Sequence, residues 1–388
     1  MDMNAVVFNG AFNIAIERRP KPVIQKPTDA IVKVAMAGIC GSELHMYRGY
    51  QKTNTGHIMG HEFTGIVEAV GEGVKSIKVG DRIVTTFSAV CMSCWFCLHG
   101  LTNRCVEGMA FGTQQLNGGQ AEYVRVPFAD GTLQLAPKDV SDDLLIMMCD
   151  IFPTGFYGAT RATDAFTSPS SYLGALPPIQ GFANGHSNGA VTDVDPEGIV
   201  TSRNDFLLQS LYETVFVCLG CGPVGLCAII TARSRGVKMI YCVDSVDERL
   251  EEARKMGGIP LKLGHDDIKQ VILDATQQRG ADAVIEVVGN QAALKSAFDL
   301  LRPCGVLSSI GFHQSELPFT GLDCYSKNLN VNFGRAPVRA VFGEALECLL
   351  ANQDKLKGFV THHLSMLEAA SGYAMFEKQK ARKVVLKP

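Results

Sequence analysis

Residues 215–226 read VFVCLGCGPVGL, an apolar run of strand length that leads into a turn of the form G-x-G-x-x-G. The residues after this turn can begin a helix, as expected of a strand–turn–helix unit that binds a dinucleotide. In such a turn Gly220 permits the tight bend, and Gly222 lets the main chain approach a pyrophosphate. Gly225 lets the helix pack closely against the strand. The motif alone could also be a tight turn and nothing more, so its surroundings decide.

The surroundings match, because a second apolar run, residues 239–243, ends in Asp244. This acid follows Gly220 by 24 positions, close to the spacing of a ribose-binding carboxylate. A carboxylate there accepts hydrogen bonds from a 2′-hydroxyl and repels a 2′-phosphate, which favours NAD over NADP. Arg249 could lie along the adenine face or be a cation on a helix surface, and both interpretations stay open.

From residue 213 onward, strand-like and helix-like segments alternate. The helix after the turn is expected to begin near Val224, so that Pro223 and Val224 lie beside the phosphates that the free N–H groups of the helix start can bind. The predicted strands are 214–219, 238–243, 283–288 and 306–310, and the predicted helices are 224–235, 246–256, 266–279 and 291–301. Right-handed crossovers between such strands produce an α/β fold with a doubly wound parallel sheet.

The bulk composition indicates a globular protein. A length of 388 residues suggests about two domains, and 46% hydrophobic residues can fill a core. A net charge of −3 offers no basic surface for nucleic acid or an anionic membrane. No apolar run reaches the roughly 18 residues of a spanning helix, and the start lacks the pattern of a secretory signal. These features predict a cytoplasmic protein without nucleic-acid or membrane partners.

Four of the thirteen cysteines lie within fifteen residues. They are spaced C-x2-C-x2-C-x7-C, at Cys91, Cys94, Cys97 and Cys105. Four thiolates at this spacing can close a tetrahedral zinc shell that has no open position and that ties down a loop. An iron–sulfur cluster or redox cysteines are the alternatives, although no two-cluster ferredoxin pattern follows. The spacing predicts a structural zinc site in a reducing compartment.

At this point the chain resembles the zinc-dependent medium-chain alcohol dehydrogenase family. The matching pieces, in the family order, are GICGS at 38–42, GHE at 60–62, the four-cysteine loop, PTG at 153–155 and the glycine turn at 220–225. The resemblance implies a GroES-like, β-rich catalytic domain at 1–160 and 333–388 and a Rossmann coenzyme domain at 161–332. It also implies two zinc ions per chain, one catalytic and one structural.

The resemblance implies a catalytic zinc bound by Cys40, His61 and a third ligand just before Pro153. Cys149 and Asp150 compete for that third position. The family spacing to the Thr-Gly pair selects Asp150, since Cys149 stands one residue too early. A shell that contains Asp is harder than one with two thiolates and should polarise a bound alcohol somewhat more.

Four further residues match family positions. Ser42 and His45 match a relay that carries the alcohol proton to solvent, although Ser42 could be a turn residue and His45 an exposed imidazole. Glu62 adjoins a zinc ligand and is expected to be a neighbouring or transient zinc partner, or else to pair with a buried arginine. Thr154 resembles the family position beside the nicotinamide.

The chain departs from the family over about 163–211, a segment rich in Ser, Gly, Pro and Asn. It could be a lid, an arm for subunit contact or an inserted non-native sequence, and we favour a flexible, non-catalytic excursion. Residues 202–212 are its best helix candidate. A displaced helix before Val215 would impair cofactor binding.

The sequence therefore predicts an NAD-linked, zinc-dependent oxidoreductase that interconverts an alcohol and an aldehyde or ketone. The alternatives are an enzyme of a specialised pathway that performs reduction or non-redox chemistry, and a catalytically silent binding protein. The apolar candidates for a substrate pocket, which mildly favour a hydrophobic or aromatic alcohol, are Phe87, Trp95, Phe111 and Phe312. Arg335 and Arg339 are the nearest candidates for binding a phosphate. The family forms homodimers and homotetramers, often by joining coenzyme domains edge to edge.

Overall fold

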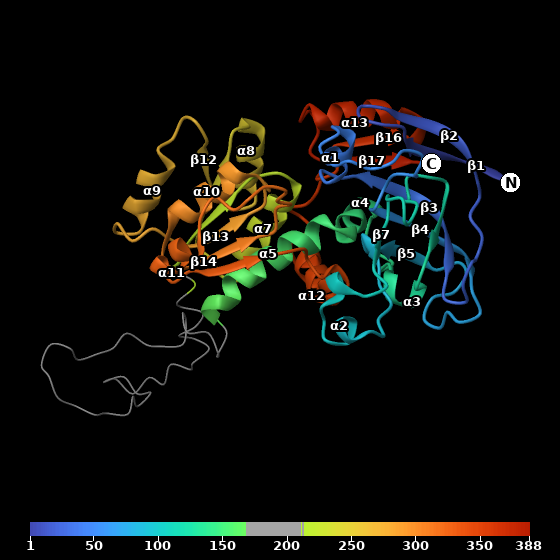
Figure 1. Ribbon diagram of the computed structural model, residues 1–388, viewed down its shortest axis with the longest axis horizontal. Coiled ribbons are helices and arrows are strands. Elements are labelled where there is room, and N and C mark those ends of the chain that lie inside the picture. The colour runs from blue at the N-terminus through green and yellow to red at the C-terminus, as the bar shows by residue number, and fades with distance from the viewer. Residues whose placement is uncertain (168–210, 212) are drawn as a thin grey trace, which may run out of the picture. The chain divides into compact units, whose positions relative to one another are not determined.

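The computed structural model describes residues 1–167, 211 and 213–388, which form two compact units (Figure 1). Unit 1 comprises Met1–Thr154 and Arg335–Pro388, and unit 2 comprises Gly155–Gly334. These limits differ by a few residues from the predicted domain limits. The predicted helix at 202–212 and most of the segment 163–211 lie outside the described residues, but its first five residues end the helix α5 (Ile151–Thr167).

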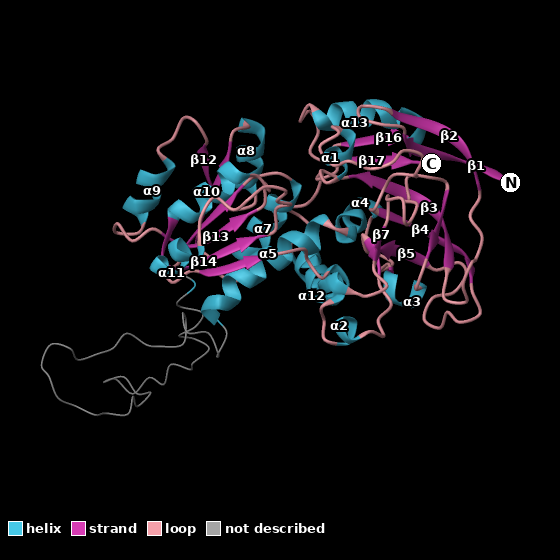
Figure 2. Ribbon diagram, viewed as in Figure 1, coloured by secondary structure: helices cyan, strands magenta, loops and turns pink. Residues whose placement is uncertain are grey.

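Unit 2 is built around one parallel sheet, and Figure 2 labels its strands β12, β13 and β14. The order of the strands is β12-β11-β10-β13-β14-β15. Each strand connects to the next through a helix, so the predicted doubly wound α/β fold is confirmed. Its strands are β10 (Val215–Leu219), β11 (Met239–Asp244), β12 (Ile259–Lys262), β13 (Ala281–Glu286), β14 (Leu301–Ser309) and β15 (Asn330–Phe333). Its other helices are α7 (Pro223–Ser234), α8 (Asp247–Lys255), α9 (Ile268–Ala275), α10 (Gln291–Leu300) and α11 (Gly321–Lys327).

The apolar runs that we expected to be strands form the middle of this sheet. All residues of β10 and of β13 are buried, because helices cover a parallel sheet on both faces. The edge strand β12 was not predicted. It has four residues and contains Pro260, which cannot donate to a strand ladder and is tolerated at a sheet edge.

Unit 1 is rich in strands. Its main sheet has the order β16-β17-β3-β4-β5-β9, with β8 also paired to β3, and only the pair β16–β17 is parallel. The strands of this sheet are β3 (Ala30–Ile39), β4 (Phe63–Val70), β5 (Arg82–Thr85), β8 (Tyr123–Val126), β9 (Leu133–Leu135), β16 (His362–Ser365) and β17 (Val384–Lys387). Two smaller sheets pair β1 (Asp2–Phe8) with β2 (Ile14–Pro20), and β6 (Ser88–Ala89) with β7 (Met109–Ala110).

The helices of unit 1 are short apart from one near its end. They are α1 (Glu43–Tyr47), α2 (Trp95–Leu98), α3 (Ala129–Thr132), α4 (Asp142–Leu145), α12 (Val338–Ala351) and α13 (Ala369–Glu377), with 3-10 turns η1 (Thr102–Arg104), η2 (Ile146–Cys149) and η3 (Met366–Glu368). Among the described residues, no helix combines the length and the apolar character needed to cross a bilayer.

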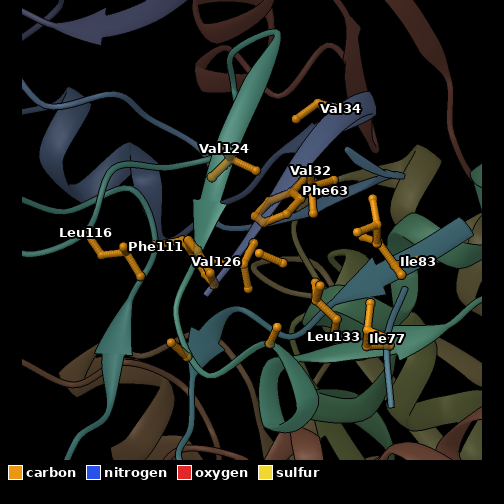
Figure 3. Packing of buried hydrophobic residues seen from close by; sticks show 14 of the residues in the cluster. Val32, Val34, Phe63, Ile77, Ile83, Phe111, Leu116, Val124, Val126 and Leu133 are labelled. Atoms are coloured by element: carbon orange, nitrogen blue, oxygen red, sulfur yellow. The ribbon is translucent and has the colours of Figure 1, made fainter. Parts of the chain in front are cut away.

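One core of unit 1 lies among β3, β4, β5, β8 and β9 (Figure 3). Phe63 of β4 meets Phe111 edge to face, with 5.2 Å between ring centroids. Phe111 is only 2% exposed and belongs to this core, and its expected place in a substrate pocket stays a prediction. The packing of this sheet fixes the end of β3, which Cys40 follows, and the start of β4, which His61 precedes.

Candidate functional site

Three segments of unit 1 bring the predicted catalytic zinc ligands together. Cys40 directly follows β3 and His61 comes just before β4, and the antiparallel pairing of these strands places the two residues side by side. Asp150 lies between η2 and α5. The potential ligand atoms of Cys40, His61, Glu62 and Asp150 all lie within 4.8 Å of one another. His61 Nε2 is 3.4 Å from Asp150 Oδ2, and Cys40 Sγ is 4.0 Å from the same oxygen.

The neighbours Cys149 and Asp150 point in different directions. Cys149 Sγ donates to the carbonyl of Phe63 at 3.4 Å and is completely buried. Burial raises the pKa of the Cys149 thiol, which keeps it protonated and makes it a poor metal ligand. Asp150 Oδ1 instead accepts a hydrogen bond from the hydroxyl of Thr154 at 2.7 Å, and Oδ2 faces His61. The geometry thus favours Asp150 as the third ligand.

The electrostatics of this cluster suit a cation. Burial by itself lowers the pKa of His61, but the charges of Cys40 and Glu43 outweigh it and raise that pKa well above its ordinary value. Burial by itself raises the pKa of Asp150, yet the facing His61 lowers it overall. A site that favours both an imidazolium and a carboxylate has an excess of negative charge. One thiol, one imidazole and one carboxylate are also donors that zinc accepts, so the residues fit this metal.

Glu43 is a buried acid beside the ligand cluster that we did not predict. It is 1% exposed, and its Oε1 lies 3.3 Å from His61 Nδ1, opposite the ring nitrogen that faces Asp150. Its Oε2 accepts hydrogen bonds from the Cys40 main-chain N–H, from Gln120 Nε2 and from the Tyr373 hydroxyl, at 3.0, 3.3 and 3.1 Å. Glu43 therefore faces the His61 ring nitrogen that points away from Asp150, a place from which a carboxylate can orient a metal-binding histidine. An acid three residues after Cys40 was the available signal.

Glu62 pairs with a lysine, where an arginine was the partner we considered. Lys383 Nζ forms a buried ion pair with Glu62 Oε2 and donates to the Ile39 carbonyl at 3.3 Å. Burial raises the pKa of Glu62, whereas Glu62 raises the pKa of Lys383 against the effect of burial. Glu62 Oε1 is buried without a hydrogen-bond partner, on a residue of the ligand cluster. The carboxylate thus stands beside the ligands with its charge offset by Lys383.

The predicted relay residues flank the start of α1. Ser42 Oγ lies 3.4 Å from Cys40 Sγ and 3.4 Å from His61 Nε2, so its hydroxyl is at the ligand cluster. His45 lies within α1. Burial and the nearby charge of Arg48 lower the pKa of His45, which keeps its imidazole neutral and able to accept a proton at pH 7.

The four-cysteine loop holds its sulfurs within 4.8 Å of one another. Cys91 Sγ and Cys105 Sγ are 3.4 Å apart, and the main-chain N–H of Cys94 donates to Cys91 Sγ. Hydrogen bonds, with Ser93 the largest contributor, outweigh burial and lower the pKa of Cys91 to about 6, which favours its thiolate. None of the thirteen cysteines, all of which lie among the described residues, forms a disulfide. The cluster fits a closed zinc shell.

Trp95, which lies between Cys94 and Cys97 in the sequence, is 61% exposed and stacks on His99.

The glycine turn lies in unit 2 between β10 and α7. Gly220 has φ +96, which glycine adopts without strain, and a Cβ on Gly225 would collide with the Gly220 carbonyl. Gly222 precedes Pro223, and a Cβ there would meet no atom within 4 Å, so the main chain is open on that side. Val224 follows in the first turn of α7.

Asp244 ends β11, beside the turn, because β10 and β11 are parallel neighbours. Its Oδ2 accepts from the Cys221 main-chain N–H at 2.8 Å, and its Oδ1 accepts from the Val246 N–H at 3.0 Å. Arg249 Nη1 is 3.6 Å from Asp244 Oδ2. The carboxylate is thus fixed next to the glycine turn, and Arg249 pairs with it.

A second buried acid, Glu286, was also missed. It ends β13, and its Oε1 accepts from the main-chain N–H groups of Val288 and Gly289, each at 2.8 Å. Its Oε2 meets the Ser309 hydroxyl and His313 Nε2, each at 2.8 Å. Glu286 therefore joins the loops that follow β13 and β14, at the carboxyl edge where a parallel sheet binds its ligand. Its position at a strand end, where Asp244 also stands, was the available signal.

Comparisons with known proteins agree with this geometry. A family model described as "Alcohol dehydrogenase GroES-like domain" matches residues 26–137, and one described as "Zinc-binding dehydrogenase" matches residues 223–351. The chain is 41% identical to zinc-type alcohol dehydrogenase B of Aspergillus flavus, over 99% of this chain and 81% of that protein. It is 43% identical to a medium chain reductase/dehydrogenase of Acremonium sp, over 84% of this chain and 98% of that protein.

The fold has solved counterparts as well. The structure of the alcohol dehydrogenase TADH from Thermus sp. ATN1 superposes with a TM-score of 0.82 at 31% identity, and the match covers 99% of each chain. A zinc-dependent alcohol dehydrogenase of Streptococcus pneumonia superposes with a TM-score of 0.80 at 29% identity, over 99% of this chain and 98% of the other.

Proposed function

Because this chain belongs to the zinc-dependent alcohol dehydrogenase family, we propose that Cys40, His61 and Asp150 hold its catalytic zinc. The chain is an oxidoreductase that interconverts an alcohol and an aldehyde or ketone. The observation that carries the proposed ligand set is the convergence of these three side chains, from separate segments, within 4.8 Å. They leave a tetrahedral shell one ligand short, as in catalytic zinc sites. Zinc held there acts as a Lewis acid that makes an alcohol hydroxyl more acidic.

The released proton leaves through Ser42 and His45 in this proposal. The Ser42 hydroxyl, which lies beside Cys40 and His61, accepts a proton from the alcohol and passes its own onward. His45 receives it, because burial and Arg48 lower the pKa of His45 and keep the ring neutral at pH 7. Glu43 and Glu62 hold negative charge beside the ligands, and Glu43 also fixes the His61 ring.

We propose NAD as the hydride acceptor in preference to NADP. The glycine turn with the start of α7 supports a pyrophosphate site, and the Asp244 carboxylate supports recognition of a free ribose 2′-hydroxyl. A 2′-phosphate would be repelled by this carboxylate. Arg249 already pairs with Asp244, which weakens the case for it as a phosphate ligand.

We propose a second, structural zinc on Cys91, Cys94, Cys97 and Cys105. Four thiols provide a complete shell, so this ion would have no position for a substrate. Its role would be to hold a loop that has few strands or helices of its own, namely α2 and η1.

We also propose that the protein is a homodimer or homotetramer. Among the described strands, β15 ends the unit 2 sheet and pairs only with β14. Its outer edge carries unpaired main-chain groups, and Phe333 on it is 40% exposed. Pairing of two such edges would satisfy these groups. The mass measured in solution by light scattering tests this point.

The decisive experiment compares Asp150→Ala with the adjacent Cys149→Ala. Zinc content and the formation of NADH are measured for the purified full chain with a panel of alcohols. We expect two zincs and NAD-dependent turnover in the unchanged protein, one zinc and no turnover in Asp150→Ala, and both properties retained in Cys149→Ala. Loss of zinc and turnover in Cys149→Ala alone would contradict the ligand set. Two zincs without turnover on any alcohol would contradict the proposed relay and cofactor site together.

A further inference from the structure

The hydroxyl of Thr154 is bonded to the predicted third zinc ligand. Thr154 Oγ1 donates to Asp150 Oδ1 at 2.7 Å, and the Thr154 main-chain N–H donates to the Asp150 carbonyl at 2.9 Å. We propose that Thr154 is a positioning residue that makes Asp150 a one-oxygen ligand and thereby keeps a metal position open for the substrate. This inference rests on the proposed ligand set of Cys40, His61 and Asp150.

This hydrogen bond differs from those of three other helical threonines, Thr163, Thr167 and Thr231. A helical threonine commonly donates to the main-chain carbonyl four residues earlier. In this structure that pattern holds, with distances of 2.9–3.3 Å, for Thr163, Thr167 and Thr231. Thr154 stands in the first turn of α5, and its hydroxyl instead reaches the side chain of the residue four positions earlier. The threonine is therefore committed to the carboxylate.

The bond leaves the two oxygens of Asp150 with different roles. Oδ1 is occupied by a charge-assisted O–H···O⁻ bond, which is among the stronger hydrogen bonds. Oδ2 lies 3.4 Å from His61 Nε2 and 4.0 Å from Cys40 Sγ, on the side of the other ligand atoms. A carboxylate can bind a metal through one oxygen or through both. Binding through both would fill the position that the alcohol needs, and the Thr154 hydroxyl opposes it.

A thiolate in the same place would need no such partner, because it has a single donor atom. The proposal therefore ties Thr154 to the choice of Asp at position 150. It also gives Thr154 a role different from the contact with the nicotinamide that the family resemblance implies. The hydroxyl has one proton, which it gives to Asp150, so a cofactor contact would use only the methyl group or an oxygen lone pair.

The test uses Thr154→Val, which keeps the shape and removes the hydroxyl, and Thr154→Ser, which keeps the hydroxyl. Thr160→Val is the matched control in the same helix, since Thr160 Oγ1 is buried and has no hydrogen-bond partner. Zinc affinity of the full chain is measured by competition with a chelator. The visible spectrum is recorded after cobalt replaces zinc, because four-coordinate cobalt absorbs more strongly than cobalt with more ligands. Subtracting the spectrum of the unchanged protein from that of a variant removes the absorbance of cobalt at the four-cysteine site, which is the same in both.

We expect Thr154→Val to bind the catalytic metal about 10- to 100-fold more weakly, as when a partner of a metal ligand is removed. Its cobalt spectrum should weaken, because both carboxylate oxygens can then bind. Thr154→Ser and Thr160→Val should match the unchanged protein in both measurements. In an Asp150→Cys background, Thr154→Val should change neither the metal affinity nor the cobalt spectrum, since a thiolate offers one donor atom.

Unchanged metal affinity and cobalt spectrum in Thr154→Val would overturn the proposal, and a raised KM for NAD in that variant would assign Thr154 to the cofactor. An equal effect in the Asp150→Cys background would also overturn it. If Thr154→Val does not fold by circular dichroism, Thr154→Ala replaces it in the same comparison. A protein that binds only one zinc before any substitution would contradict the proposed function itself, which keeps the two failures distinct.

Discussion

Replacement of Lys383 by methionine should strongly destabilise unit 1. The side chains of Lys383 and Glu62 are 1% and 0% exposed, so the substitution leaves a carboxylate without its partner in the interior. Breaking a buried ion pair from one side typically costs about 3–5 kcal/mol. At an m-value of roughly 2 kcal/mol per molar urea, this lowers the unfolding midpoint by about 2 M.

The assay can use the single tryptophan of the chain, Trp95, which lies in unit 1 and reports its unfolding by fluorescence. Lys357→Met is the matched control, because Lys357 pairs with Asp354 at the surface and the two side chains are 77% and 85% exposed. That control should hardly move the midpoint. The double variant Glu62→Gln with Lys383→Met should recover most of the loss, since a neutral pair leaves no buried charge.

Two results would refute this reasoning. One is a midpoint for Lys383→Met that equals the midpoint of Lys357→Met. The other is a double variant that is less stable than Lys383→Met alone, which would mean that the two residues stabilise the unit independently of each other.

Three further outcomes follow from the site. His45→Gln should slow alcohol oxidation roughly 100-fold at pH 7, and less at higher pH, where hydroxide can replace the base. In the unchanged protein, burial and Arg48 lower the pKa of His45. The kcat of that protein should therefore fall only at pH values below the ordinary pKa of histidine. Asp244→Ala should weaken NAD binding about 10- to 100-fold, as expected for lost hydrogen bonds to a charged group, and should narrow the preference for NAD over NADP in coenzyme titrations. Cys94→Ser should release one zinc and lower the thermal stability while the other zinc stays bound, which metal analysis and calorimetry would check.

The parts of the fold that could be predicted are those with a strong local pattern. The run at 215–226 has an apolar strand, a glycine turn and a helix start next to one another, and each supports the others. The short edge strand β12 could not be predicted from its four residues, because Pro260 argues against a strand unless its place at the sheet edge is known. Helix α9 is shorter than the predicted range 266–279, because it ends at Ala275. Gln277 and Gln278 have positive φ, which the sequence did not indicate.

The site shows the same division between local and distant information. Spacing to a motif selects Asp150 over Cys149, and the structure turns these two side chains in the directions that this spacing requires. The partners of the ligands could not be found in this way. Tyr373 is 330 residues from Glu43, and Lys383 is 321 residues from Glu62, so only the folded sheet brings each pair together. The hydroxyl of Thr154 lies near its ligand in sequence, but the family position had suggested another partner for it.

The place of β17 within the unit 1 sheet has a consequence for how the protein is made. The ribosome synthesises all of unit 2 after the first segment of unit 1 and before the second. Strand β17, in the second segment, lies between β16 and β3 in the sheet. At synthesis rates of about 5–20 residues per second, the roughly 230 residues from Asp150 to Lys383 take on the order of 10–50 s. During that interval the nascent thiols and imidazole of the first piece are exposed to whatever metal the cell supplies, while the strand that closes the sheet does not yet exist. All the proposed zinc ligands therefore lie in the piece that is synthesised first, well before β17, the strand that pairs with β3 beside Cys40.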